Sequence, residues 1–164
     1  MLSALELREV TLVGHSFGGG EIVRYLTRHG ASRIARVALI APAATPFVMK
    51  TADNPKGVPA EALQVFRNTI EQDFPKWLED GKQAFFVADT SPSLQDWVMQ
   101  LMLTTPLWVA LECNRIMTST DFRAELPRNS VPTLIIHGDK DASAAALIRT
   151  PSSGSMRARR TGCF

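Results

Sequence analysis

Apolar and polar residues alternate along the first part of the chain in the pattern of a strand, a helix and a second strand. Residues 9–14 (EVTLVG) form a β-branched run that ends at a glycine, which predicts a strand. In residues 17–30, apolar side chains recur at helical spacing and Gly30 provides a stop. Residues 35–42 (ARVALIAP) are apolar until the final proline, as in a parallel strand covered on both faces. This order predicts a right-handed βαβ unit.

The middle of the chain, residues 46–120, has no convincing strand pattern. Proline follows a residue that can cap a helix at Ser91-Pro92 and at Thr105-Pro106, and Pro59 stands near another helix start. Apolar residues then recur at helical spacing: Leu63, Phe66, Ile70, Leu94, Trp97, Val98 and Leu101. We predict an all-helical insertion whose apolar side chains either pack its helices together or line an apolar pocket.

The last part of the chain returns to a strand pattern and then loses all periodicity. Residues 130–141 (SVPTLIIHGDKD) contain an apolar run that Pro132 opens and a glycine ends, which predicts a third strand. Ser, Ala, Arg and Gly dominate the sequence after it. We therefore expect a βαβ core in residues 1–45, a helical insertion in 46–120, a core strand and its loop in 121–144, and a disordered or non-native tail in 145–164.

Composition and charge narrow the class of protein. The chain has 164 residues, of which 45% are hydrophobic and 21% charged, as in a soluble globular domain. No apolar run approaches the ~20 residues that span a bilayer, and the start lacks the pattern of a secretory signal, so we expect a cytoplasmic protein with no membrane partner. The tail is basic, but it has neither interleaved aromatic residues nor an apolar helical face, so no nucleic-acid partner is expected. The two cysteines match no zinc or redox spacing, and we expect no metal.

The sequence Gly14-His15-Ser16-Phe17-Gly18 lies between the first predicted strand and helix and has the G-x-S-x-G spacing of a nucleophile elbow. At its apex, the Ser16 side chain would stand clear of the sheet. The flanking glycines avoid clashes of a Cβ with neighbouring backbone. The backbone N–H of Phe17, at the start of the helix, would stabilise an oxyanion. A phosphate-binding loop does not fit, since no Gly-Lys-Ser/Thr follows.

The segments "GHSFGGGE" and "TDFRAELPRNSVPTLIIHGDKD", with the helical insertion between them, resemble the α/β-hydrolase family. The nearest subgroup is that of the cofactor-free haloperoxidases and aryl esterases, and the resemblance covers residues 9–144. It implies an α/β fold with a parallel sheet and a helical cap. It also implies that a serine attacks a small-molecule ester, that an acyl-enzyme forms, and that water or hydrogen peroxide releases the acid or peracid. No cofactor is implied.

Carried over to this chain, the resemblance makes Ser16 the nucleophile, Phe17 an oxyanion donor, and Asp141 the triad acid that follows the third strand. Asp139 is the competing carboxylate, and we expect it to stabilise the turn by bonding its own backbone. The resemblance places the triad in the chain order Ser, Asp, His.

None of the three histidines fits the role of the base. His15 is fixed within the turn beside the nucleophile. His29 lies at the far end of the helix, about 18 Å away at about 1.5 Å per residue. His137 precedes the acid, whereas the base of the family follows it. The strands expected before residue 9 are also missing, so the sequence resembles an incomplete copy of the fold. With both sheet edges open, the isolated chain would aggregate or dimerise, and a homo-oligomer is one way to cover them.

Two function classes follow from this reading. The first is a serine hydrolase, here in a truncated form with little or no activity. The second is a non-catalytic, vestigial or partner-dependent form of the same fold. An epoxide or halide hydrolase would need aspartate in place of Ser16, whereas an acyltransferase would share the elbow.

Overall fold

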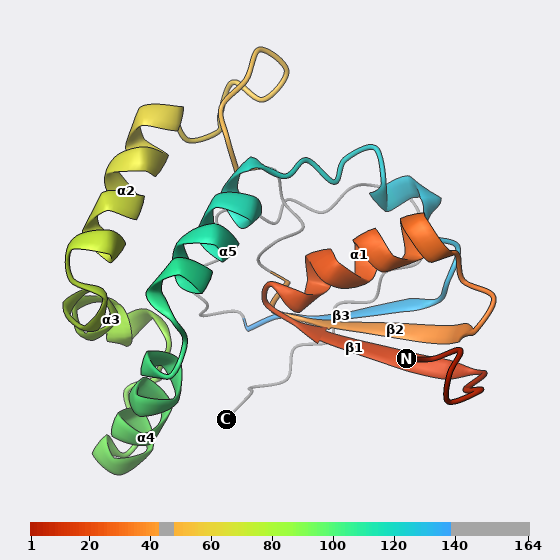
Figure 1. Cartoon of the computed structure of the whole chain (residues 1–164), viewed down its shortest axis with the longest axis horizontal. Helices are drawn as coiled ribbons and strands as arrows, with labels where there is room; N and C mark the ends of the chain where they lie inside the picture. The colour runs from red at the N-terminus through yellow and green to blue at the C-terminus, as the bar shows by residue number, and fades with distance from the viewer. Residues whose placement is uncertain (43–47, 139–164) are drawn as a thin grey trace. The chain divides into compact units, whose positions relative to one another are not determined.

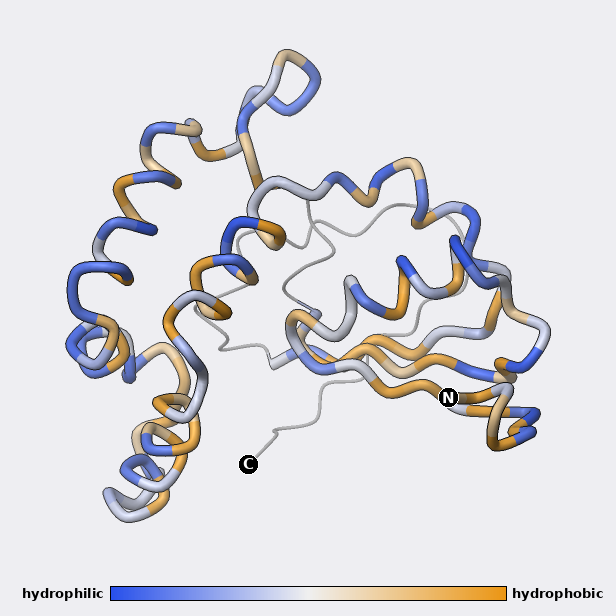
Figure 2. The backbone as a smooth tube through the Cα atoms, viewed as in Figure 1, coloured by the Kyte–Doolittle hydropathy of each residue, from blue (hydrophilic) through white to orange (hydrophobic). Residues whose placement is uncertain are grey.

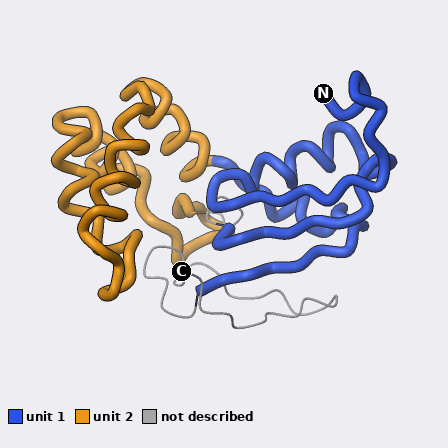
Figure 3. Tube along the Cα trace, turned by 90° about the horizontal axis from the view of Figure 1, so that it is seen from below, with its two compact units in different colours: residues 1–47, 120–164 blue, residues 48–119 orange. Residues whose placement is uncertain are grey.

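A computed structural model describes residues 1–42 and 48–138 of the chain. The chain divides into two compact units, coloured separately in Figure 3. Unit 1 consists of residues 1–47 and 120–164, and unit 2 of residues 48–119. Asp141 and the predicted tail at 145–164 lie outside the described residues.

Unit 1 is built on a three-stranded parallel sheet in the order β1-β2-β3. The strands are β1 (Val10–His15), β2 (Ile34–Ile40) and β3 (Thr133–Ile136). The helix α1 (Gly18–His29) links β1 to β2 and lies along one face of the sheet (Figure 1). The predicted βαβ unit and the third strand are therefore confirmed, and the fold is α/β.

The core of unit 1 lies between α1 and the sheet. Buried side chains of α1, β2 and the segment before β3 form one cluster: Ile22, Leu26, Ile34, Val37, Leu39 and Val131. The helix ends where its pattern predicted, at Gly30, whose φ of 73° suits a glycine. A short 3₁₀ helix, η2 (Leu126–Arg128), precedes β3. The core thus fixes the helix that begins just after Ser16 against the strand that precedes Asp141.

Unit 2 is helical, and its helices are α2 (Ala60–Gln72), α3 (Phe74–Gly81), α4 (Pro92–Leu103) and α5 (Leu107–Ser119), with a 3₁₀ turn η1 (Lys82–Ala84). Its described residues contain isolated β-bridges but no strand. The predicted helical insertion is thus confirmed, although α3 was not predicted. The carboxylate of Asp73 caps α3 by accepting a hydrogen bond from the Lys76 N–H at 2.9 Å, and Pro75 fits the first turn.

The apolar pattern of unit 2 separates into buried and exposed residues. Leu63 and Ile70 on α2 are buried, as expected for helix packing, whereas Phe66 of the same predicted stripe is exposed. On α4, by contrast, Leu94, Trp97 and Leu101 are all exposed. Figure 2 shows hydrophobic positions along both helices, which illustrates that hydropathy alone does not separate the two cases. For α4, the interpretation of the stripe as a packed core is wrong.

Candidate active site

Ser16 occupies a strained turn between β1 and α1. Its φ is 49°, in the left-handed region that non-glycine residues rarely adopt. The Ser16 N–H donates to the carbonyl of Ile40 at 2.9 Å, so the residue stays joined to β2. The Ser16 carbonyl accepts from the Gly19 N–H at 3.1 Å, and α1 begins at once. This strand-turn-helix geometry is the one that a nucleophile elbow requires.

The two elbow glycines differ in how strictly the turn needs them. A Cβ on Gly14 would lie 2.7 Å from both the Gly18 carbonyl oxygen and the Ile22 side chain. A Cβ on Gly18 would meet nothing closer than a Glu21 oxygen at 3.8 Å. The expected clash is therefore real at Gly14, but the same explanation is wrong for Gly18. Gly14 makes the close approach of strand and helix possible.

The backbone N–H of Phe17 lies at the start of α1. Phe17 is the residue before the first helical one, with φ −54° and ψ −37°. Among the described residues, none accepts a hydrogen bond from this N–H. The amino end of a helix carries partial positive charge, so a free N–H there favours an anion. These features are those of an oxyanion donor.

The carboxyl ends of the three strands lie side by side at the same edge of the sheet. His15, Ile40 and Ile136 are paired in register across β1, β2 and β3. The Ala41 N–H donates to the Ile136 carbonyl at 2.8 Å, and Ala41 has a positive φ of 42°. The chain therefore leaves β3 at the sheet edge that carries Ser16, about 10 Å away across two strand spacings. Asp139 and Asp141 follow this point but lie outside the described residues.

The three histidines lie in different surroundings. His15 ends β1 and is exposed. His29 is the last residue of α1, and its ring centroid lies 5.2 Å from that of Tyr25. His137 follows β3, and both its ring nitrogens are buried. That none of them acts as the base stays a prediction.

An ion pair that the sequence did not reveal joins α1 to the segment before β3. A guanidinium nitrogen of Arg24 lies 3.1 Å from a carboxylate oxygen of Glu125, whose side chain is 13% exposed. The same guanidinium lies 5.0 Å from the ring centroid of the buried Phe122. No local signal predicts this contact, because its partners are far apart in the sequence. It holds the helix behind Ser16 to the chain that leads towards Asp141.

Searches for two other kinds of site cover only the described residues. In residues 1–42 and 48–138, no three His, Cys, Asp or Glu side chains lie close enough together to hold a metal ion. No helix in this same part of the chain is both long and apolar enough to cross a membrane.

Comparison with known proteins identifies the protein family of this chain. The α/β-hydrolase fold family matches residues 1–146, so the chain belongs to that family. The chain is 36% identical to a non-heme haloperoxidase of Rhodococcus erythropolis over 148 residues, a match that covers 86% of this chain and 53% of the haloperoxidase.

Solved structures agree with this assignment. A bromoperoxidase of Bacillus anthracis superimposes with a TM-score of 0.78 at 34% identity, over 87% of this chain and 54% of that one. An esterase of Exiguobacterium antarcticum gives a TM-score of 0.78 at 30% identity, over 87% and 53%. The chain thus spans about half the length of the relatives it matches.

Proposed function

We propose that this chain carries the nucleophile and the oxyanion site of a serine hydrolase that acts on small esters. The observation that carries the proposal is the backbone of Ser16, which has a φ of 49° between a parallel strand and the helix that starts beside it. Strained backbone conformations of this kind cluster at active sites, where the strain is part of the mechanism. Relatives named as a haloperoxidase and an esterase support the same chemistry.

In the proposed reaction, the Ser16 hydroxyl oxygen attacks the ester carbonyl carbon. The carbonyl oxygen becomes an oxyanion, and the Phe17 N–H donates to it. The bond to the alcohol then breaks, and the alcohol leaves with the proton that a base has taken from Ser16. Water attacks the acyl-enzyme and releases the acid, or hydrogen peroxide releases a peracid. Asp141 would orient the base, and the reaction needs no cofactor.

The proposal assigns the base to none of the three histidines of this chain. A triad without one member loses several powers of ten in rate. We therefore expect the 164-residue chain alone to hydrolyse p-nitrophenyl acetate at least about 10³-fold more slowly than a chain that is completed with the base. Turnover by this chain that disappears with Ser16→Ala would contradict the assignment of the base.

A chimera tests the nucleophile directly. Residues 1–146 of this chain replace the matching segment of the R. erythropolis haloperoxidase, and ester hydrolysis is measured. We expect activity that Ser16→Ala lowers by about 10³-fold or more in kcat. Ser32→Ala, at an exposed serine beyond α1, is the matched control and should change nothing. A Ser16→Ala chimera that retains its kcat would refute the proposed nucleophile.

The same chimera distinguishes the two candidate carboxylates. Asp141→Asn should lower kcat by about 10²-fold or more, because the base loses its orienting partner. Asp139→Asn, two positions earlier, should keep most of the activity. The reverse order of effects would reassign the acid to Asp139.

A further inference from the structure

One peptide group at the end of β2 connects Ser16 to the end of β3. The Ile40 carbonyl of this group accepts the hydrogen bond from the Ser16 N–H at 2.9 Å. The Ala41 N–H of the same group donates to the Ile136 carbonyl at 2.8 Å. Because a peptide group is planar, these two hydrogen bonds have a fixed direction relative to each other. The group therefore links the candidate nucleophile to the strand that leads towards the two candidate carboxylates.

The residue that completes this peptide group, Ala41, has an unusual backbone conformation. Its φ is 42°, in the left-handed region that residues with a Cβ rarely adopt. A residue that continued the parallel strand would have a φ of about −120°. Such a conformation costs free energy, and it persists only where the surrounding structure holds the residue in place. The conformation of Ala41 therefore needs an explanation.

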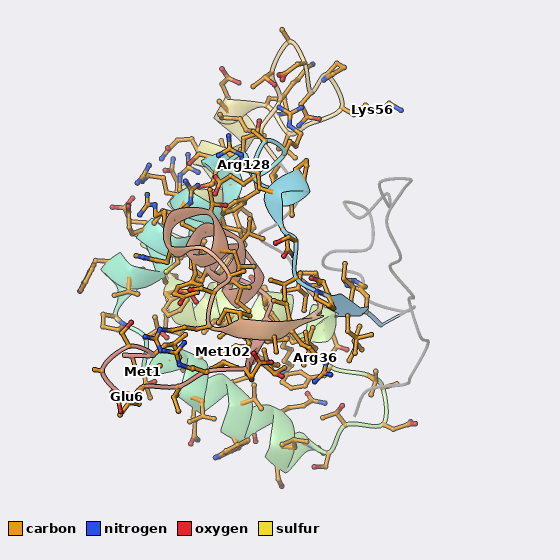
Figure 4. All side chains as sticks on the ribbon, turned by 90° about the vertical axis from the view of Figure 1, so that its right-hand side faces the viewer. Met1, Glu6, Arg36, Lys56, Met102 and Arg128 are labelled. Atoms are coloured by element: carbon orange, nitrogen blue, oxygen red, sulfur yellow. The ribbon has the colours of Figure 1, made fainter. Side chains whose placement is uncertain are left out.

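The place of Ala41 in the fold suggests that its conformation serves the candidate site. Four non-glycine residues in the described part of the chain have a positive φ, and two of them, Glu6 (labelled in Figure 4) and Glu9, precede β1. The other two are Ser16 and Ala41. These lie beside each other, because the residues directly before them are register partners in β1 and β2. Strained residues cluster at active sites, and this pair lies at the candidate one.

A change of φ at Ala41 would disturb the backbone around Ser16. If φ returned to the negative region, either the chain after Ala41 would take a new direction or the peptide group before it would rotate. A rotation would weaken the hydrogen bonds to the Ser16 N–H and the Ile136 carbonyl, and a new direction would move the chain that lies beside Ser16. A displacement of about 1 Å at a reacting group can lower the rate about 10²-fold.

We propose that Ala41 is a positioning residue, whose left-handed backbone holds the Ile40–Ala41 peptide group in the orientation that fixes Ser16. This role rests on the proposed function, because it serves catalysis only if Ser16 is the nucleophile. It depends on φ and not on the size of the side chain. Position 41 should therefore accept glycine and asparagine, which tolerate a positive φ, and reject valine, whose branched Cβ does not.

Amide hydrogen exchange of the full chain, followed by NMR, tests the effect on the backbone. In Ala41→Val, exchange of the Ser16 N–H should become at least about tenfold faster relative to exchange of the Val37 N–H. Val37 is the internal reference, since its N–H donates to the Pro132 carbonyl at 3.0 Å in the same sheet. A general loss of stability would accelerate both amides equally and leave this ratio unchanged. In Ala41→Asn and Ala41→Gly, the ratio should stay within about twofold of that in the unaltered chain.

Two controls separate the backbone from the side chain. Ala38→Val makes the same exchange three residues earlier on β2, at a residue without a positive φ, and should leave the exchange ratio unchanged. Asparagine is close to valine in size, so Ala41→Asn controls for bulk at position 41. Circular dichroism checks that each variant folds. If Ala41→Val does not fold, Ala41→Leu takes its place, and its Ser16 N–H should exchange at least about threefold faster relative to Val37.

Ester hydrolysis by the chimera tests the effect on catalysis. Ala41→Val should lower kcat at least about tenfold and leave KM within about twofold, because the ester still binds while Ser16 is displaced. Ala41→Asn and Ala41→Gly should keep kcat within about threefold. Each kcat is expressed per active site after titration with a fluorophosphonate. A variant that only destabilised the fold would have fewer active sites but an unchanged kcat for each of them.

Any of three results would overturn the proposal. The first is an unchanged ratio of Ser16 to Val37 exchange in Ala41→Val, or in Ala41→Leu where that variant replaces it. The second is an unchanged kcat for the Ala41→Val chimera while Ser16→Ala abolishes hydrolysis. The third is an equal loss of kcat with asparagine and with valine, which would assign the effect to side-chain size. A chimera whose kcat survives Ser16→Ala would instead refute the proposed nucleophile, and the exchange result would still show whether Ala41 orients the backbone of Ser16.

Discussion

The ion pairs inside unit 1 and inside unit 2 differ in how far apart their partners lie in the sequence. In unit 1, elements far apart in the sequence meet, as in the register of β2 with β3 and in the ion pair of Arg24 with Glu125. In unit 2, the ion pairs join residues three or four positions apart on exposed helix surfaces, as in Lys76 with Asp80. The ion pair of unit 1 therefore joins elements that are far apart in the sequence, whereas the ion pairs of unit 2 are local and its helices pack through buried side chains such as Leu63 and Ile70.

This difference predicts in which unit a substitution should lower the stability of the fold more. Side chains of unit 1 that fix the turn at Ser16 lie in a packed cluster, and changes there disturb several elements at once. The helices of unit 2 expose large apolar residues such as Trp97 and Trp108, so the loss of one of these removes few contacts. The same substitution should then have unequal effects in the two units.

The largest difference is expected for leucine to alanine. Leu39 in unit 1 is 5% exposed and belongs to the core cluster, so Leu39→Ala should lower the free energy of unfolding by about 2–5 kcal/mol. Leu101 on α4 is 49% exposed, and Leu101→Ala should change the free energy of unfolding by no more than about 0.5 kcal/mol. Urea unfolding followed by circular dichroism measures both. Equal losses would show that the contrast between the units does not extend to stability.

Glycine to alanine at the elbow sharpens the comparison within unit 1. Gly14→Ala places a Cβ 2.7 Å from the backbone of Gly18, so we expect a loss of about 1–3 kcal/mol in urea unfolding. Gly18→Ala has room and removes a flexible residue from a helix start, so its stability should be unchanged or slightly higher. If Gly18→Ala were the more damaging variant, the close approach at Gly14 would not be what shapes the turn.

The long-range ion pair should contribute less than the core. Arg24→Met leaves the carboxylate of Glu125 nearly buried without its partner, and we expect a loss of about 1–2 kcal/mol. Lys76→Met in unit 2 should leave the free energy of unfolding nearly unchanged, because Lys76 and its partner Asp80 are both exposed. Adding Glu125→Gln to Arg24→Met should recover part of the loss. No recovery in this double-mutant cycle would mean that Arg24 acts through its contact with Phe122.

The smallest effect on stability is expected for a local ion pair in unit 1, which shows whether short sequence separation or membership of a unit makes an ion pair weak. Arg123, two residues away, donates hydrogen bonds to Asp121 in unit 1 and lowers the pKa of this carboxyl, chiefly through those bonds. A lowered native pKa stabilises the fold above the ordinary aspartate pKa of about 3.9, and the stabilisation disappears as the pH falls through the native pKa. Asp121→Asn should thus cost only about 0.2–1 kcal/mol at pH 7. Unfolding at a series of pH values should show the variant and the unaltered chain converging in acid; a gap that persisted there would rule out the charge as its cause.

The sequence predicted the elements of unit 1 well because glycine and proline mark their ends. Val10–His15 ends at the elbow, α1 stops at Gly30, and Pro42 follows β2. The helix α3 was missed because it is short, although Asp73 and Pro75 are valid start signals.

Other features could not be read from one sequence. Periodicity showed that Leu94, Trp97 and Leu101 share a helix face, but it could not show whether anything covers that face. The contact of Arg24 with Glu125 required the folded chain. At the candidate site, the spacing predicts Ser16 and Phe17 as nucleophile and oxyanion donor, and these roles stay predictions. The different needs of the two elbow glycines became visible only from the distances around them.

Two non-glycine residues with positive φ, Ser16 and Ala41, meet at the same end of the sheet. Each such residue costs roughly 1–3 kcal/mol of folding free energy, so this end is a natural target for thermostabilisation. Glycine at position 41 would relax the backbone without removing a reactive group. At position 16, the same exchange would delete the hydroxyl. Heat tolerance and the proposed reactivity of Ser16 thus oppose each other at position 16, whereas position 41 carries no such conflict.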